Sequence, residues 1–544
     1  MTNGPLIVQS DKTALLEVDH PQASDARHDL AIFAELERAP EHIHTYRITR
    51  LGLWNARAAG HDSDFVLAIL DKYSKFAVPT SVRSDIAETM SRYGRLVIQR
   101  SEDGELELFS TDRPILLEAS RHRKIAELLD GPISNEAFRI QPWARGQVKQ
   151  ELLKLGWPAE DFAGYTDGTP HAIDLDEDGW NIRDYQTHAV DKFWSGGSGV
   201  VVLPCGAGKT IVGAAAMAVA KTNTLILVTN TVSARQWRSE LIKRTTLTED
   251  EIGEYSGSMK EVKPVTIATY QILTTKRKGE YAHLALLNAN DWGLIVYDEV
   301  HLLPAPIFKM TADLQARRRL GLTATLVRED GKEGDVFSLI GPKRFDAPWK
   351  EIEAQGYIAP AACFEVRIDL DEEERLNYAI ASQDERYRIA ATSPVKIKVI
   401  LDLLKRHKGE PTLIIGQYLD QIHAVSAALN VPEITGETAI DERERLFEEF
   451  RTGKISTLVV SKVANFSIDL PEASVAIQIS GSYGSRQEEA QRLGRLLRPK
   501  ADGRTASFYT LISRDTVDQD FAQNRQRFLA EQGYSYQIID AHEL

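Results

Sequence analysis

The sequence predicts an α/β protein in which two parallel-sheet domains follow one another behind an α+β N-terminal region. From about residue 180 onward, short runs of Val, Ile and Leu alternate with polar helical patterns. Continuous apolar runs of this kind are typical of strands buried on both faces of a sheet that helices cover. With 544 residues, the chain is also too long for a single hydrophobic core.

Two series of apolar runs mark the predicted strands of the two domains. The first series lies at residues 200–203, 225–229, 265–269, 294–297 and 319–323. The second series lies at residues 412–415, 457–460, 475–479 and 506–511. Pro348, Gly356 and Pro360 interrupt the pattern between them, so we expect the two domains to meet near residues 347–361.

The chain before residue 180 contains shorter elements. Residues 51–59 and 81–93 are typical of amphipathic helices, and residues 96–109 of a hairpin. Helices followed by a hairpin are consistent with a winged-helix-like domain. A segment rich in Asp, Gly, Thr and Pro at residues 164–179 is typical of a linker. We therefore expect four units, at residues 1–125, 126–179, 180–346 and 347–544.

Composition and charge narrow the class of protein. The chain has a net charge of −14 and only two cysteines, Cys205 and Cys363, which exclude a disulfide framework and favour a reducing cytoplasm. The apolar runs fall far short of the roughly 20 residues that span a bilayer, and no secretory signal is recognisable, so we expect no membrane partner. A negatively charged chain attracts nucleic acid poorly at long range, so any nucleic-acid site must be local.

A predicted phosphate-binding loop follows the first strand of the first series. It consists of Pro204, Cys205, Gly206, Ala207, Gly208, Lys209 and Thr210. Glycines let backbone N–H groups curl around a phosphate, and the N-terminus of the following apolar helix adds a favourable dipole. In this context Lys209 would contact the β- and γ-phosphates of ATP, and Thr210 would bind Mg²⁺. Leu203 replaces the first glycine of the general pattern, which leaves a glycine-rich turn with an incidental lysine as the alternative.

Two adjacent carboxylates, Asp298 and Glu299, follow the apolar strand at residues 294–297. Because consecutive side chains diverge at the end of a strand, Asp298 can hold Mg²⁺ while Glu299 faces the attacking water as general base. His301 then lies where it could link the bound nucleotide to a nucleic-acid strand. An acidic pair alone is more often a solvated strand end, but a phosphate-binding loop upstream favours the catalytic interpretation.

In their order along the chain, these motifs resemble those of superfamily-two helicases, which are motors with two RecA-like domains. Arg183 and Gln186, just before the first strand, resemble the adenine-binding element of that superfamily. Thr323 and Thr325, with an alanine between them, resemble its coupling motif. The resemblance implies that these threonines and His301 couple the acidic strand to the nucleic acid.

Two further motifs of the superfamily lie in the second domain. Residues 461–471 resemble the motif that touches ribose and the nucleic-acid backbone, with Asp469 in the matching position. Residues 487–498 form a predicted helix in which arginines share one stripe. The resemblance implies that Arg495 and Arg498 are arginine fingers for the γ-phosphate and that Gln491 contacts the nucleotide. The alternative for this helix is a salt-bridged surface helix.

The segment Arg328, Glu329 and Asp330, which follows the coupling motif directly, resembles the RED element of the XPB family. Three charged residues after a strand would otherwise be a solvated loop. The resemblance to bacterial XPB-family DNA helicases covers residues 180–544 and extends to the N-terminal part. It implies an ATP- and Mg²⁺-dependent motor that moves 3′ to 5′ on single-stranded DNA in DNA repair. It also leaves room for a repair nuclease as partner and for damage recognition by residues 126–179.

Three other functions remain open at this point. An RNA helicase would carry the same ATPase motifs, because these motifs do not encode the sugar of the nucleic acid. A translocase that moves on duplex without separating the strands is also compatible with them. A nucleotide-binding scaffold that recruits repair proteins is a third alternative, although a scaffold has no need of Lys209, Asp298, Glu299 and Arg495 together.

Overall fold

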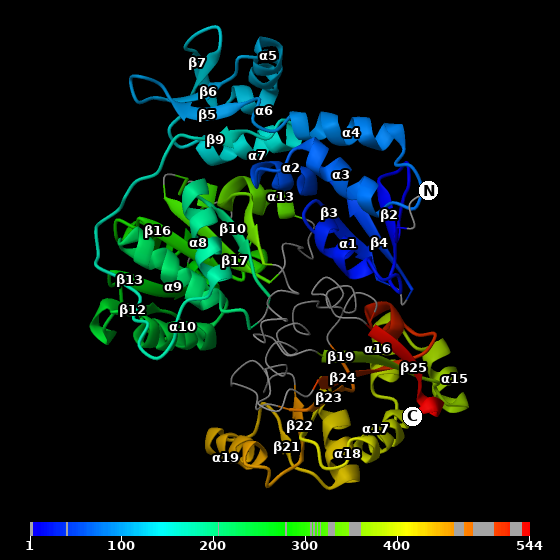
Figure 1. Ribbon diagram of the computed structural model, residues 1–544. Helices are drawn as coiled ribbons and strands as arrows, with labels where there is room; N and C mark the ends of the chain where they lie inside the picture. Colours follow the sequence, from blue (N-terminus) through cyan, green and yellow to red (C-terminus); the bar gives the residue numbers. More distant parts are fainter. Residues whose placement is uncertain are drawn as a thin grey trace.

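The computed structural model describes residues 4–39, 42–204, 206–277, 280–304, 307, 311–312, 314–315, 317–324, 332–347, 361–461, 473–481, 505–522 and 536–544. Four larger sheets organise these residues: one of four strands, one of five and two of seven (Figure 1). Among the described residues, none of the helices has both the length and the apolar character that crossing a membrane requires.

The first unit is an antiparallel sheet covered by helices. Its strands are β1 (Leu6–Val8), β2 (Thr13–Glu17), β3 (Ala34–Arg38) and β4 (Ile43–Ile48), in the order β1-β2-β4-β3. Its helices are α1 (Ala23–Leu30), α2 (Arg50–Ala58), α3 (Ser63–Tyr73) and α4 (Thr80–Ser91). Together they bury one apolar cluster that extends from Leu6 to Met90.

The second unit has a five-stranded sheet in the order β7-β8-β6-β5-β9. Its strands are β5 (Val97–Arg100), β6 (Leu106–Phe109), β7 (Leu129–Pro132), β8 (Ala137–Ile140) and β9 (Glu160–Asp161). Its helices are α5 (Arg113–Arg121), α6 (Arg123–Ala126) and α7 (Arg145–Leu155). The predicted hairpin is present as β5 paired with β6. The five-stranded sheet and its apolar cluster include residues on both sides of the boundary expected after residue 125. We therefore propose that the two N-terminal units comprise about residues 4–92 and 96–163.

The third unit is a parallel seven-stranded sheet in the order β12-β13-β11-β16-β17-β10-β18. Its strands are β10 (Gly199–Val202), β11 (Thr224–Val228), β12 (Ile252–Tyr255), β13 (Val265–Thr269), β16 (Leu294–Asp298), β17 (Arg318–Thr323) and β18 (Lys343–Asp346). The helices of the unit are α8 (Asp184–Gly196), α9 (Lys209–Ala220), α10 (Thr231–Arg244), α11 (Tyr270–Thr274) and α13 (Glu333–Asp335). All five predicted strands of the first series are confirmed.

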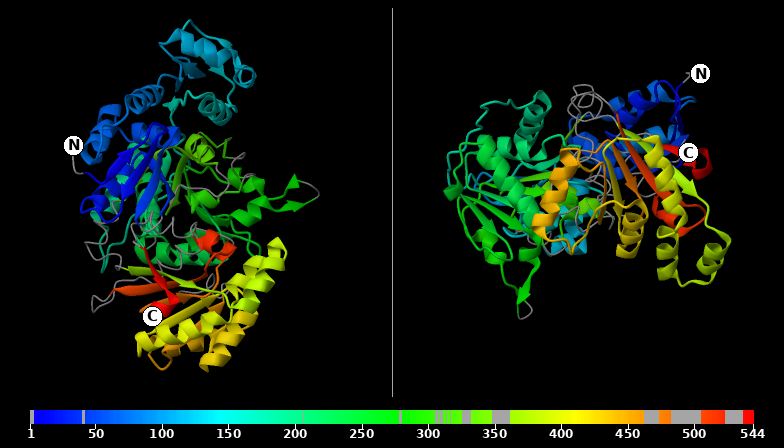
Figure 2. Two further views of the ribbon diagram at one scale, coloured as in Figure 1. Left: turned by 90° about the vertical axis from the view of Figure 1, so that its right-hand side faces the viewer. Right: turned by 90° about the horizontal axis from the view of Figure 1, so that it is seen from below.

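One hairpin leaves the body of this third unit. Strand β14 (Lys276–Arg277) pairs with β15 (Glu280–Tyr281), and Figure 2 shows this green ribbon projecting away from the sheet. Short helical turns complete the unit: η1 (Glu249–Glu251), η2 (Leu284–Asn288), η3 (Val300–Leu302) and the π-helical η4 (Val336–Ile340). Separate apolar clusters cover the two faces of the sheet, so its strands are buried on both sides.

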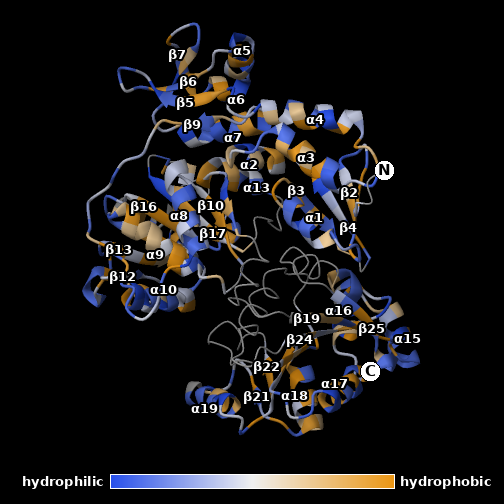
Figure 3. Cartoon of the chain, viewed as in Figure 1, coloured by the Kyte–Doolittle hydropathy of each residue, from blue (hydrophilic) through white to orange (hydrophobic). Residues whose placement is uncertain are grey.

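The fourth unit repeats the parallel architecture in the order β21-β22-β20-β23-β24-β19-β25. Its strands are β19 (Ala361–Ile368), β20 (Thr412–Gly416), β21 (Glu433–Ile434), β22 (Thr457–Ser461), β23 (Val475–Gln478), β24 (Ala506–Ser513) and β25 (Tyr536–Asp540). Its helical segments are α15 (Glu372–Ile380), α16 (Gln383–Ala391), α17 (Val395–Arg406), α18 (Leu419–Leu429), α19 (Ile440–Arg451) and η5 (Ala541–Glu543). The predicted strands of the second series are confirmed, and Figure 3 shows the outer helices α15 and α19 as largely hydrophilic.

Candidate active site

The loop between β10 and α9 has the backbone that a phosphate-binding loop needs. Gly206 and Gly208 have φ angles of +82° and +81°, a region that side-chain-bearing residues rarely adopt. A β-carbon at position 208 would also collide with the side-chain amide of Gln186. Lys209 and Thr210 therefore begin α9 directly behind a glycine turn, with their backbone N–H groups at the free N-terminus of the helix.

Leu203 explains why the missing first glycine is tolerated. Its backbone N–H donates to the carbonyl of Thr323 at 2.9 Å, and its side chain is fully buried. Position 203 thus still belongs to the sheet, and the turn begins only after Pro204.

The start of α8 supports the loop from behind. The side-chain amide of Gln186 donates to the carbonyl of Ala207 at 3.0 Å, and the Tyr185 hydroxyl donates to the same carbonyl at 2.7 Å. Arg183 Nη1 in turn donates to the Tyr185 hydroxyl at 3.1 Å. The structure therefore brings the predicted pair Arg183 and Gln186 to the loop, together with Tyr185, which the sequence did not single out.

The predicted acidic pair lies at the end of β16, beside Lys209. The Lys209 ammonium is 3.2 Å from Glu299 Oε1, and both side chains are largely buried. Glu299 has a φ of +49°, a backbone conformation that side-chain-bearing residues rarely adopt. The loop lysine thus contacts the second of the two carboxylates, whereas the divergence of the two side chains stays a prediction.

The two carboxyl groups differ in their electrostatics. Burial, with the neighbouring charge of Glu299, raises the pKa of Asp298 to about 6. Burial would also raise the pKa of Glu299, but the charges of Lys209 and His301 outweigh it and hold that pKa below its usual value. Glu299 is thus the ionised member of the pair in the absence of ligand, while Asp298 titrates close to neutrality.

Two aromatic residues that the sequence analysis missed hold Asp298 in place. The indole N–H of Trp237 donates to Asp298 Oδ2 at 2.9 Å, and the Tyr270 hydroxyl donates to the Asp298 carbonyl at 2.8 Å. Trp237 is buried on α10, and its ring packs so closely on Gly213 of α9 that a side chain there would collide with it. Nothing in the local sequence of α10 indicated the bond to Asp298.

The predicted coupling residues also come together. His301 Nδ1 lies 2.6 Å from Thr323 Oγ1 and 3.6 Å from Glu299 Oε2. Strands β16 and β17 are parallel neighbours, which places the ends of both strands side by side. The backbone N–H of Ala324 lowers the pKa of Glu299 by hydrogen bonding, so the start of the coupling motif touches the proposed base.

The remaining predicted residues lie outside the described part of the chain. They are Cys205, Thr325, Arg328, Glu329, Asp330, Asp469, Gln491, Arg495 and Arg498. Their roles stay predictions.

Three protein families match the chain. The ERCC3/RAD25/XPB C-terminal helicase family matches residues 352–543, and the res subunit family of type III restriction enzymes matches residues 180–328. A helicase conserved C-terminal domain family matches residues 6–132.

Individual relatives match over the full length. DNA 3'-5' helicase XPB of Kineococcus radiotolerans is 68% identical over 544 residues, which cover 100% of this chain and 98% of the relative. DNA 3'-5' helicase XPB of Mycobacterium tuberculosis is 63% identical, with 100% and 99% covered. The general transcription and DNA repair factor IIH helicase/translocase subunit XPB/SSL2 of Saccharomyces cerevisiae is 30% identical, with 98% and 72% covered.

Proposed function

The chain belongs to the XPB family of helicases, and on this premise we propose that it is an ATP-dependent 3′ to 5′ DNA helicase or translocase that acts in DNA repair. The observation that carries the proposal is the 3.2 Å contact between Lys209 and Glu299 at the carboxyl edge of the first seven-stranded sheet. It joins the phosphate-binding loop to the acidic strand, which are the two parts that ATP hydrolysis requires.

The residues of this edge have different roles in ATP binding and hydrolysis. Lys209 exchanges its contact with Glu299 for the β- and γ-phosphates when ATP arrives, which frees Glu299 to accept a proton from the attacking water. Tyr185 and Gln186 fix the loop through the Ala207 carbonyl, so the loop does not have to be ordered by the nucleotide. His301 and Thr323 connect Glu299 to the end of β17, so a change in the contacts of Glu299 alters the part of the chain that leads to the nucleic acid.

The residues present also fit Mg²⁺. A hydroxyl at Thr210 and a carboxylate at Asp298 are oxygen ligands of the kind that this ion takes, directly or through water. Burial raises the pKa of Asp298 to about 6, so ionising this carboxyl group costs free energy. A bound cation would lower that cost. When bound, Mg²⁺ neutralises charge on the phosphate oxygens.

The second parallel-sheet domain supplies the rest of the proposed cycle. Arg495 and Arg498 are proposed to reach the γ-phosphate when ATP draws the two domains together, with Asp469 and Gln491 contacting the nucleotide. Contacts to DNA are proposed to go mainly to backbone phosphates, so sequence preference is low. Arg328, Glu329 and Asp330 are proposed to couple ATP hydrolysis to DNA. A repair nuclease is the proposed protein partner. The buried free Cys363 is consistent with work in a reducing cytoplasm.

Duplexes with a single-stranded tail test this proposal. We expect ATP-dependent strand separation of a duplex with a 3′ tail and little of one with a 5′ tail. Displacement of a bound protein from duplex DNA without strand separation would favour the translocase alternative. A stronger response to a matched RNA tail than to a DNA tail would contradict the proposed DNA track.

A further inference from the structure

A cavity of about 550 Å³ lies at the edge of the first seven-stranded sheet that is opposite to the candidate active site. Its lining includes Ser198, directly before β10, and Arg318, the first residue of β17. Since the active site lies where these strands end, the cavity is at the amino edge of the same sheet. Its other walls come from the two N-terminal units, through residues such as Ala58 and Lys149, and from Tyr93 between them.

Positive charge predominates in this cavity. Among its described lining residues are five cations against two carboxylates, an excess of three positive charges in a chain whose net charge is −14. The cations are Lys149, Lys192, Arg318, Arg319 and Arg344, and the carboxylates are Glu160 and Asp161.

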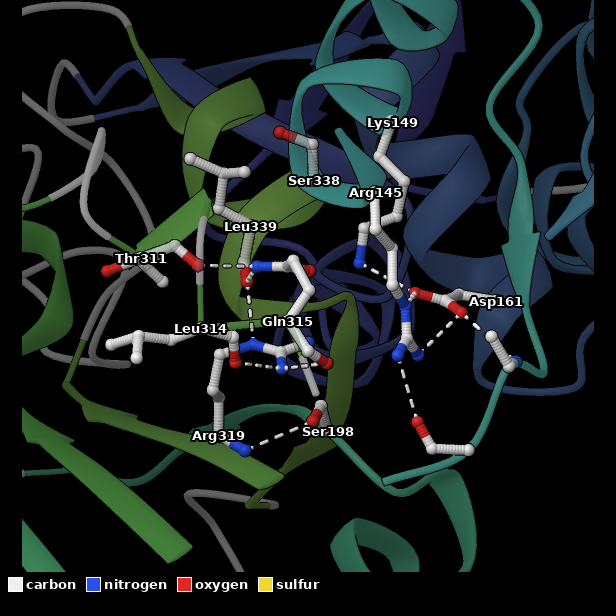
Figure 4. Close-up of polar contacts among 12 residues, drawn as sticks. Arg145, Lys149, Asp161, Ser198, Thr311, Leu314, Gln315, Arg319, Ser338 and Leu339 are labelled. Atoms are coloured by element: carbon white, nitrogen blue, oxygen red, sulfur yellow. Dashed lines mark hydrogen bonds and ion pairs between the residues drawn. The ribbon is translucent and has the colours of Figure 1, made fainter. Parts of the chain in front are cut away.

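The largely buried carboxylate of Asp161 already binds two cations. Arg145 donates to both of its oxygens, at 3.0 and 2.8 Å, and Lys149 Nζ donates to one of them at 2.8 Å (Figure 4). Burial, together with the charges of Arg319 and Arg145, lowers the pKa of Lys149 to about 8, although the charge of Asp161 opposes this shift. A single carboxylate therefore compensates two cations and leaves none of its charge for the others.

Two of the other arginines are bound only by neutral acceptors. The buried guanidinium of Arg319 donates to the carbonyls of Leu339, Leu314, Gln315 and Arg317, as Figure 4 shows for the first three. That of Arg344 donates to the carbonyls of Ser198, Gly196 and Ala58. Carbonyl groups satisfy the N–H donors but do not cancel the charge, so the cavity keeps its positive potential.

Three polar groups on the lining have donors to spare. The Arg318 guanidinium lies 4.0 Å from the ring centre of Trp194 and 5.1 Å from that of Tyr165, and it makes no hydrogen bond to any described residue. The Tyr93 hydroxyl and the Lys192 ammonium likewise have no hydrogen-bond partner within the described ranges. Both rings lie within cation–π distance of the guanidinium and favour its position on the wall of the cavity.

We propose that this cavity is a second phosphate-binding site, separate from the ATP site, in which Arg318, Lys192 and Tyr93 contact the phosphate oxygens. Arginine binds phosphate through paired N–H donors. Asp167 lies close enough to interact with the charge of Arg318, but the lining still carries more cations than carboxylates, and this surplus favours an anion. The phosphate belongs either to a free nucleotide or pyrophosphate or to a nucleic-acid strand. Because the walls come from three units, an occupied site links the two N-terminal units to the motor domain.

Calorimetric titration with pyrophosphate in the presence of EDTA tests the site. The Lys209→Ala protein is used so that the ATP site contributes little, and it is expected to retain one binding equivalent. Adding Arg318→Gln and Lys192→Gln is expected to weaken that binding at least about tenfold, because charge-assisted hydrogen bonds are lost. Adding Lys243→Gln instead makes a matched control, since Lys243 is an exposed cation on α10 of the same domain. This control is expected to leave the affinity unchanged.

A milder variant guards against a folding defect. Tyr93→Phe keeps the ring, which packs edge-on against Phe337, and removes only the hydroxyl. It is expected to weaken pyrophosphate binding roughly threefold to tenfold. Equal affinity in the Lys209→Ala protein with and without the Arg318, Lys192 and Tyr93 changes would overturn the proposal, as would the absence of any binding.

A short DNA strand separates the two sources of phosphate. A strand of ten thymidines with a 5′ phosphate is titrated against the same variants. Binding that weakens with Arg318→Gln supports a site for a nucleic-acid strand, whereas Arg318-dependent binding of pyrophosphate alone supports a site for a free phosphate compound. Both readouts are independent of ATP turnover, so failure of this proposal is distinct from failure of the helicase function.

Discussion

The two edges of the first seven-stranded sheet carry opposite balances of charge. At the carboxyl edge, Lys209 contacts Glu299, and Trp237 donates to Asp298, so each carboxylate has a partner. At the amino edge, five cations line a cavity with two carboxylates, and Arg318 makes no hydrogen bond to a described residue.

This difference shows how one sheet can serve two purposes. A paired edge keeps its charged groups oriented without a ligand, and an arriving nucleotide has to exchange partners with them. An edge with surplus positive charge is instead stabilised by whatever anion enters it. Both edges share the strands β10 and β17, but each edge has its own set of charged groups.

The largest effect is expected at the amino edge, for Asp161→Asn. The change leaves the buried Arg145 and Lys149 without a counter-charge, which costs about 3–5 kcal/mol. Hydrogen exchange of the α7 amides would measure the loss locally. Asp420→Asn is the matched control, because it breaks an exposed pair with Arg388 that contributes at most about 1 kcal/mol. Equal effects of the two changes would contradict the described charge cluster.

Lys209→Ala comes next and concerns the carboxyl edge. The variant lacks the ammonium that is proposed to contact the β- and γ-phosphates, and removing one partner of such a charge pair costs about 2–5 kcal/mol. We therefore expect kcat/KM for ATP to fall roughly 30-fold to several thousand-fold. Lys221→Ala, at the exposed end of the same helix α9, serves as control and should have little effect. Similar losses in both variants would show that a change in the helix, and not the loss of the Lys209 ammonium, is responsible.

Trp237→Phe tests a positioning residue of the same edge. The change keeps an aromatic ring but removes the N–H that bonds to Asp298, a hydrogen bond to a charged group that contributes about 1.5–3 kcal/mol. The Mg²⁺ concentration for half-maximal ATP turnover should rise about tenfold or more, while nucleotide binding in EDTA stays the same. Trp292→Phe matches the loss of packing, since Trp292 is buried in the same domain and donates to the Leu286 carbonyl. An unchanged Mg²⁺ requirement in Trp237→Phe would contradict the role.

A smaller effect is expected from pH. Protonated Asp298 is neutral and a poor ligand for Mg²⁺, and its raised pKa of about 6 keeps it protonated into the weakly acidic range. The affinity for Mg²⁺–nucleotide should thus increase from pH 5 to pH 7, by about tenfold. Trp237→Phe should move the midpoint upward, because the indole hydrogen bond lowers this pKa. A midpoint that is the same in both proteins would assign the titration to another group.

The carboxyl edge could be predicted from the sequence because each of its parts is a contiguous motif at the end of a strand. Asp298 and Glu299 directly follow an apolar run, Lys209 follows another through the glycine-rich loop, and parallel strands bring their ends to one edge. Trp237 was missed because its partner Asp298 is 61 residues away, and no local pattern announces that bond.

The amino edge could not be predicted for a related reason. Its cavity combines residues as far apart as Tyr93, Lys192 and Arg344, and the docking of the N-terminal units creates it. Edge strands were also missed where they are short or polar. Strand β21 has only two residues, Glu433–Ile434, and β18 (Lys343–Asp346) has a single apolar residue, so neither forms an apolar run.

We propose that the carboxyl edge hydrolyses ATP to drive the motor on DNA. Steady-state ATP hydrolysis with and without single-stranded DNA tests this claim, for the unaltered protein, Glu299→Gln and the exposed-charge control Lys243→Gln. We predict stimulation by DNA in the unaltered protein and the control, and a fall in kcat of about 10²–10⁴-fold in Glu299→Gln with ATP binding retained. DNA-stimulated turnover that survives Glu299→Gln, or nucleotide binding without turnover in the unaltered protein, would contradict the claim.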